Sequence, residues 1–146
     1  MASSSSDNLP APGQISLALL ILRIACGLPL LYHGSGILFG AFGGPGPQGF
    51  AAFMHAPDII GYLVGLAQFG GALAILTGIL TRVGAVCIII VMLGAVFLAH
   101  LPHGYDVTKG GLEYALALLL CALALLISGG GAYSLGSALP EGLRKL

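Results

Sequence analysis

Charged residues are scarce in this sequence. The 146-residue chain has five lysines and arginines and five aspartates and glutamates, so its formal net charge is zero at pH 7. Soluble proteins use about a quarter of their residues as charges, whereas this chain uses 7% and has a mean hydropathy of +1.04. The composition excludes an ordinary soluble domain, predicts contact with a lipid bilayer, and gives no reason to expect a nucleic-acid partner.

Cysteine is scarce as well. Cys26, Cys87 and Cys121 all lie in apolar segments, and no two of them form a CxxC pair. This pattern argues against a disulfide framework and predicts three small core side chains.

Both ends of the chain differ from its centre. Residues 1–14 ("MASSSSDNLPAPGQ") are rich in serine and proline, which predicts a disordered tail. They lack the basic start and the small-residue cleavage motif of a signal peptide. Residues 15–139 are expected to form one transmembrane domain, and residues 140–146 a short cytoplasmic tail.

Four apolar segments fill the central domain: residues 15–39, 59–80, 83–101 and 112–127. Most of them reach the roughly 20 residues that a helix needs to cross a bilayer. The fourth is short unless Gly110 and Gly111 extend it. We therefore predict an all-α polytopic membrane protein, a bundle of four transmembrane helices.

Arg23 interrupts the first segment. An arginine at a helix centre costs about 2.5–3.5 kcal/mol, and the ten Leu and Ile residues of residues 15–31 roughly offset that cost. Arg23 is also near one end, where it can extend toward the membrane surface. Together with Arg82 it is expected to anchor the cytoplasmic side, because the positive-inside rule places both termini there and leaves only Lys109 outside.

This orientation gathers the titratable side chains at the outer face of the membrane: His33, His55, His100, His103, Asp58, Asp106 and Glu113. Glu113 begins the fourth segment, where an acid can stabilise the helix N-terminus. It is also the candidate catalytic residue, as a proton acceptor facing His100.

Two histidine pairs suggest ligands. His100 and His103 have a spacing that could bind a metal, but Pro102 should break the helix between them and no third ligand is regularly spaced. We therefore predict no metal site, with these two as the only candidates. His33 and His100 could instead donate to a quinone carbonyl or ligate a haem or chlorin, or simply hydrogen-bond neighbouring helices.

The segment "GGPGPQG" (residues 43–49) contains a formal GxGxxG motif. It follows no strand, and its prolines are expected to prevent a helix from starting there. The sequence therefore predicts an irregular outer loop and no nucleotide site.

Small residues mark the second segment as a packing helix. Gly61 and Gly65 form a GxxxG pair, and Gly70, Gly71 and Gly78 extend the small faces. Gln68 is three residues from both Gly65 and Gly71, so it should point into the bundle. There it could form an interhelical hydrogen bond or contact a ligand.

Several of these residues resemble the DoxX family of small four-span membrane proteins. The resemblance rests on Arg23 and Gly27, on "HG" at His33-Gly34, and on "QFGGALAILTGILTR" (residues 68–82). His100, Glu113 and "GGGAYSLG" (residues 129–136) complete it.

The resemblance implies a bacterial inner-membrane location and a link to quinone-coupled redox chemistry, as in terminal oxidase and thiosulfate:quinone oxidoreductase systems. Relatives usually carry a lysine where this chain has Ile37 and a glutamate where it has Gln68. If these two charges form an ion pair in relatives, losing both costs less stability than losing one, because an unpaired buried charge is costly. The resemblance then implies that part of the family's polar site is neutralised here.

Three functions remain open. The first is an accessory subunit of a larger respiratory or photosynthetic electron-transfer complex, without activity of its own. The second is a quinone-binding oxidoreductase component that uses His33, Gln68, His100 and Glu113. The third is a small-molecule carrier, which has least support because no inverted repeat is evident.

Overall fold

The computed structural model describes residues 10–144, which contain helices and no strands. Four helices form the body: α1 (Pro12–Phe39), α3 (Asp58–Thr77), α4 (Thr81–Gly94) and α5 (Glu113–Ser128). Two short helices lie outside it: α2 (Gly46–Phe53) and α6 (Glu141–Arg144). The all-α polytopic bundle expected from the sequence is confirmed.

Three helical segments are long and apolar enough to cross a bilayer: Pro12–Phe39, Asp58–Thr77 and Thr81–His103. The fourth, α5, has 16 residues. At a rise of 1.5 Å per residue it spans about 24 Å, less than the roughly 30 Å hydrocarbon core. Gly110 and Gly111 do not extend it, because Gly110 has a φ of 82° and both belong to the turn before Glu113.

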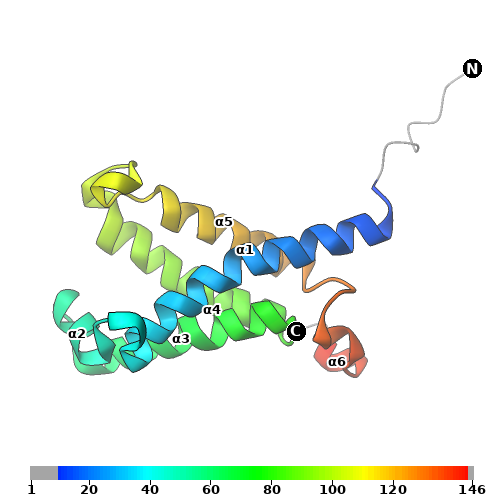
Figure 1. Cartoon of the computed structure of the whole chain (residues 1–146), viewed down its shortest axis with the longest axis horizontal. Coiled ribbons are helices and arrows are strands. Elements are labelled where there is room, and N and C mark those ends of the chain that lie inside the picture. The colour runs from blue at the N-terminus through cyan, green and yellow to red at the C-terminus, as the bar shows by residue number, and fades with distance from the viewer. Residues whose placement is uncertain (1–9, 145–146) are drawn as a thin grey trace, which may run out of the picture.

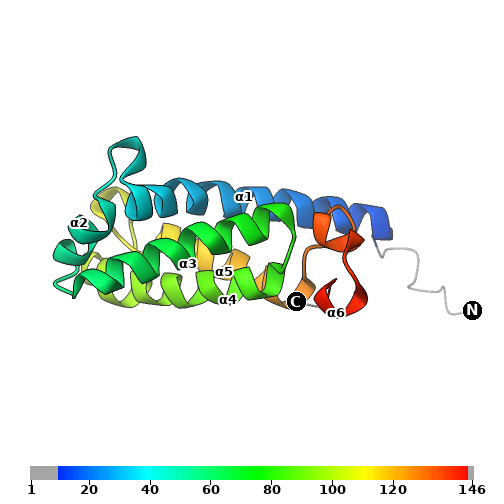
Figure 2. The same ribbon diagram turned by 90° about the horizontal axis from the view of Figure 1, so that it is seen from below.

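The helices form an elongated bundle in which α1 packs along α3, α3 along α4, and α4 along α5 (Figures 1 and 2). The connections of residues 40–57 and 101–112 lie at one end, called the loop end (Figure 2). The start of α1, the turn between α3 and α4, and residues 129–144 lie at the opposite end, called the termini end (Figure 2). Toward the loop end the α1–α3 pair diverges from the α4–α5 connection (Figure 1).

The core is formed by small and branched side chains from all four helices, including Cys26, Leu30, Ile75, Ile88 and Leu125. The outward faces are equally apolar. On α1, for example, Ile21, Ile24 and Leu28 are each more than 40% exposed. Such a surface would be unstable in water and is the surface that lipid requires.

Glycines set the closest helix contacts. A Cβ on Gly61 would overlap the carbonyl oxygen of Pro47 in α2, and one on Gly65 would lie 3.0 Å from the Cα of Leu38 in α1. A Cβ on Gly71 would likewise lie 3.0 Å from the carbonyl oxygen of Gly84 in α4. These approaches explain why small residues were needed there.

Gly70 and Gly78 behave differently from those three. Gly70 is exposed, and a Cβ there would meet no atom within 4 Å, so it makes no close helix contact among the described residues. It is adjacent to Gly71, and a single residue step turns the helix by about 100°, away from the neighbour. Gly78 ends α3 with a φ of 73°, a conformation that favours glycine.

Two expectations about irregular segments were also wrong. Gly46–Phe53 forms helix α2, with Pro47 in its first turn, where proline costs no hydrogen bond. At the N-terminus, α1 begins at Pro12, inside the segment expected to be disordered, and the side chain of Gln14 accepts a hydrogen bond from the Ala11 amide. Residues 1–9 of that tail lie outside the described residues.

The chain after α4 remains helical instead of breaking at Pro102. Residues Ala95–His100 form a π-helical turn, and Leu101–His103 a 3₁₀ turn that has Pro102 in its first positions. Since proline cannot donate a backbone hydrogen bond, a change of helix type before it accommodates the missing donor.

Candidate functional site

His100 and Glu113 hold the connection between α4 and α5. His100 Nδ1 lies 2.7 Å from the carbonyl oxygen of Gly110, so the tautomer protonated at Nδ1 donates a hydrogen bond to it. A carboxylate oxygen of Glu113 accepts from the Val107 amide at 3.1 Å. Both side chains therefore bond to the backbone of one loop and not to each other.

His103 turns back on its own helix. Its Nδ1 lies 3.1 Å from the Ala99 carbonyl oxygen, while His100 bonds in another direction. Within residues 10–144, no group of three or more His, Cys, Asp and Glu side chains is arranged to hold a metal ion. His55 is exposed at the end of the α2 loop with a φ of 51°, and Asp58 begins α3.

Asp106 shapes the same connection. Its carboxylate accepts hydrogen bonds from the Thr108 hydroxyl at 2.8 Å and from the Thr108 amide at 2.9 Å. These two bonds, the side-chain bond first, lower the pKa of Asp106 below its ordinary value. The residues at the loop end thus form a hydrogen-bonded turn in which Asp106 and Lys109 are exposed and Glu113 is half-buried.

Gln68 lies deep in the bundle, as its spacing predicted. It is 5% exposed, and it belongs to the inner face of α3 that carries Gly65 and Gly71. Across from it, a Cβ on Gly34 would lie 2.6 Å from the Phe69 amide nitrogen, so α1 and α3 cross closely here. Among the described residues the Gln68 amide has no hydrogen-bond partner.

Ile37 stands where the resemblance to the family leads one to expect a lysine. Its Cγ2 methyl group lies 3.1 Å from the Cβ position of Gly65, at the α1–α3 contact. Ile37 therefore makes an apolar contact here, at a place where a buried cation would need an acidic partner.

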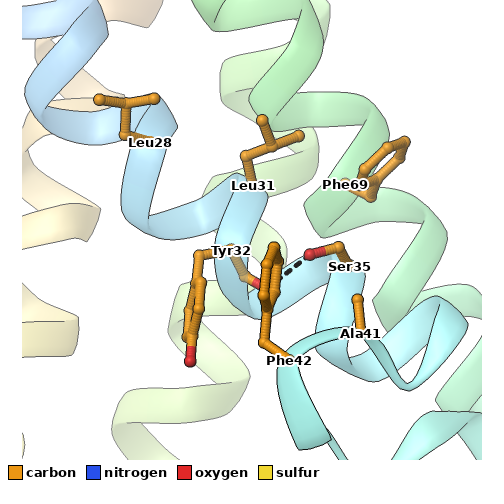
Figure 3. Close-up of a pocket in the computed structure, with 7 residues that line it drawn as sticks. All are labelled: Leu28, Leu31, Tyr32, Ser35, Ala41, Phe42 and Phe69. Atoms are coloured by element: carbon orange, nitrogen blue, oxygen red, sulfur yellow. Dashed lines mark hydrogen bonds between the residues drawn. The ribbon is translucent and has the colours of Figure 1, made fainter.

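An aromatic groove opens on the other side of this contact. It has a volume of about 360 Å³ and is lined by Leu28, Leu31, Tyr32, Ser35, Ala41, Phe42 and Phe69 (Figure 3). The Tyr32 and Phe42 rings stack with centroids 4.9 Å apart and planes 19° apart. The Ser35 hydroxyl donates to the Tyr32 carbonyl oxygen at 2.8 Å, so the interior of the groove is almost wholly apolar.

His33 does not line this aromatic groove, but it contacts one of the residues that do. Its ring is exposed and meets the Tyr32 ring edge to face, with centroids 5.5 Å apart. His33 could be selected from the sequence, but the groove could not, since Phe42 comes from a turn whose position relative to α1 has no local sequence signal. The spacing of Tyr32, Phe39 and Phe42 was the one available hint.

The four predicted ligand residues do not form one cluster. Gln68 is in the core, His33 is beside the aromatic groove, and His100 and Glu113 bond to the loop after α4. No hydrogen bond or ring contact joins any two of the four within the described part of the chain.

Arg23 is fixed at the termini end in a way that the sequence analysis did not foresee. Its side chain is 2% exposed and is enclosed by the protein itself. Its Nε donates to the Ile75 carbonyl at 2.8 Å and its Nη2 to the Leu76 carbonyl at 2.6 Å. Its Nη1 donates to the carbonyls of Gly130 and Tyr133, at 3.1 and 2.7 Å.

Arg82 has the same role for another helix. Its Nε and Nη2 donate to the carbonyls of Leu126 and Ile127 in the last turn of α5, at 3.0 and 3.3 Å. A helix C-terminus presents unpaired carbonyls and negative partial charge. Each arginine therefore satisfies one such end, Arg23 that of α3 and Arg82 that of α5.

The fold and these contacts define the protein as a small polytopic α-helical membrane protein whose polar groups mostly hold its own helix ends and turns. The family model DoxX matches residues 18–101, more than half of the chain, and the chain belongs to the DoxX family. Comparison with curated proteins and with solved structures gives no match.

The matched region ends with the turn after α4. It contains Arg23, His33, Gln68 and His100, whereas Glu113 and the closing "GGGAYSLG" follow it. The match therefore covers most of α1 and all of α2, α3 and α4. Helix α5 lies outside it and packs against α4.

Proposed function

We propose that this protein is a small accessory subunit that packs within the bilayer against a larger electron-transfer complex. One observation carries the proposal: its polar side chains are used to build the bundle. Arg23, Arg82, His100 and Glu113 each hydrogen-bond to backbone of their own chain. A catalytic site instead needs such groups to converge on a shared space.

The exposed face of α3 supports a partner. Gly70 has open space around the position of its Cβ, and the neighbouring exposed side chains on this face, Leu66 and Leu73, are apolar. Small residues on a membrane helix let another backbone approach closely. A transmembrane helix of a partner subunit is therefore a suitable neighbour for this face.

Gentle extraction from the native membrane, followed by mass spectrometry and an absorption spectrum of what travels with the protein, tests this proposal. We expect co-migration with a cofactor-bearing complex at fixed stoichiometry. The variant Gly70→Leu should lose the partner without loss of folding, because Gly70 is exposed and a Cβ there meets no atom of its own chain within 4 Å. Gly13→Leu, also at an open position, is the matched control.

The aromatic groove favours a second candidate function. The His33 ring contacts the ring of Tyr32, which lines the groove, so a quinone that extends from the groove past Tyr32 could accept a hydrogen bond from the imidazole. In that case the extracted protein should migrate alone or as a small oligomer with bound quinone. Quinone retention should then fall in His33→Phe and stay unchanged in His103→Phe. Migration without partner or quinone would contradict both proposals.

A further inference from the structure

A polar pocket of about 400 Å³ lies at the termini end, away from the aromatic groove. Its walls come from the turn between α3 and α4 and from the glycine-rich loop after α5. Neither proposed function uses this pocket. No acidic side chain is among the described residues that line it, whereas Arg82 is.

The N-terminus of α4 opens on this pocket. Its N-cap residue is Leu80, in the left-handed region with a φ of 53°, and no side chain caps the helix. The first-turn amides of an α-helix have no carbonyl partner within the helix, and they point along its axis with positive partial charge. A helix start without a capping side chain is a suitable place for an anion.

Thr81, the first residue of α4, gives independent evidence for a ligand. It lines the pocket and is 3% exposed, yet its hydroxyl has no hydrogen-bond partner in the described chain. The hydroxyl faces Gly130 on the opposite wall, where a Cβ would lie 2.7 Å from it. A buried hydroxyl without a partner costs stability, so one that persists in a polar pocket indicates a group that completes it.

The glycine-rich wall of the pocket leaves space for a ligand beside the Thr81 hydroxyl. Gly129 and Gly131 have φ values of 75° and 73°, and Gly130 lies between them without a side chain. The Gly129 amide donates to the Leu125 carbonyl, but the absence of side chains at Gly130 and Gly131 leaves room beside the backbone for a tetrahedral anion.

We propose that this pocket binds a phosphate group, held by the first-turn amides of α4, the Thr81 hydroxyl and the charge of Arg82. The pocket lies where the transmembrane helices end, at the depth of lipid headgroups. The phosphate can therefore come from an anionic lipid or from solution, and the chemistry of recognition is the same.

The test compares unfolding midpoints in three preparations: nanodiscs of phosphatidylcholine, the same with phosphatidylglycerol, and phosphatidylcholine nanodiscs with inorganic phosphate. A ligand that binds only the folded state raises the midpoint. A rise with phosphatidylglycerol alone identifies the lipid as the source, and a rise with inorganic phosphate identifies the soluble anion. No rise in either preparation overturns the proposal.

Thr81→Val isolates the hydroxyl. It should bind the effective ligand about tenfold more weakly, since one hydrogen bond to a charged group is lost. Thr77→Val is the matched control, because Thr77 does not line the pocket and its hydroxyl already bonds within the chain, donating to the Leu73 carbonyl at 2.8 Å and accepting from the Ile79 amide at 3.3 Å. Equal binding by Thr81→Val and wild type would overturn the assignment. Should Thr81→Val not fold, native mass spectrometry of the wild type, with inorganic phosphate competing against retained phosphatidylglycerol, decides the same question.

Discussion

At the scale of single residues, the side chains that look most functional are tied to backbone. Arg23 illustrates this best, since one guanidinium satisfies carbonyls of α3 and of the loop after α5. Arginine suits this position because its donors form a rigid planar fork and its charge persists in a low-dielectric setting. Lysine would supply the charge without the geometry.

Arg23→Lys should therefore destabilise the bundle by about 2–4 kcal/mol, because several buried carbonyls lose their donors and one ammonium group cannot reach them all. Denaturation in mixed micelles, followed by circular dichroism, measures the change. Ile24→Val, on the exposed face of the same helix, should stay within about 0.5 kcal/mol of wild type. A similarly small effect for Arg23→Lys would show that these hydrogen bonds do not stabilise the fold.

Substitutions of Glu113 can separate the effect of its hydrogen bond on stability from the effect of its negative charge. Its carboxylate accepts a hydrogen bond from the Val107 amide, and a glutamine oxygen can accept the same bond. We expect Glu113→Gln to keep near-wild-type stability and Glu113→Ala to lose about 1 kcal/mol. The thermal midpoints of the two variants measure this difference. Equal losses would mean that the negative charge at the start of α5, and not the hydrogen bond, is what matters.

The lowered pKa of Asp106 predicts that folding stability depends on pH through the loop end. Because its folded-state pKa is lowered, it adds stability above its unfolded pKa, and this contribution disappears as the pH falls through the folded value. In Thr108→Val the main cause, the side-chain hydrogen bond, is absent, so the carboxyl should titrate closer to its ordinary range. A carboxyl ¹³C NMR titration below pH 5 distinguishes the two forms, and identical curves would contradict the assigned cause.

At the scale of elements, the positions of the helices followed from hydropathy, while their contact faces followed from small residues. A span that is apolar all round gives no amphipathic signal, so Gly61, Gly65 and Gly71 were the informative positions. Residue type alone could not show that Gly71 contacts α4 while the adjacent Gly70 faces outward.

Other features could not be predicted because they depend on backbone groups that any sequence carries. The acceptors of Arg23 are carbonyls up to 110 residues away. The acceptor of His100 is the carbonyl of Gly110. The aromatic groove likewise depends on the turn that places Phe42 against Tyr32. Arg23 and Arg82 were recognised as important, but their function as helix-end partners required the fold.

Gly61→Ala tests the contact between α2 and α3. The added methyl group would overlap the Pro47 carbonyl, so α2 must shift, and we expect a loss of about 1–3 kcal/mol. Gly70→Ala adds the same methyl group to the same helix in open space. It should be neutral or stabilising, since alanine favours a helix over glycine by about 1 kcal/mol. Equal midpoints for the two variants would contradict the close α2–α3 approach.

At the scale of the whole molecule, the bundle has two chemically different ends. The loop end carries Asp106, Glu113 and the exposed histidines, whereas the termini end carries Arg23 and Arg82. Both arginines have structural partners, so their position is explained without reference to the cytoplasm. The orientation that the positive-inside rule assigns is therefore a separate statement about the protein and needs its own test.

Cysteine accessibility tests that orientation. Thr108→Cys places a thiol on the exposed loop end, and Ser137→Cys places one on the exposed termini end. If both termini are cytoplasmic, a membrane-impermeant maleimide added to intact bacterial cells should label the first variant and spare the second until the membrane is opened. The native cysteines lie within the helices, and Cys26 is fully buried, so the unsubstituted chain gives the background. The reverse pattern would place the phosphate pocket on the outer face, where soluble phosphate and lipid of the opposite leaflet would be its ligands.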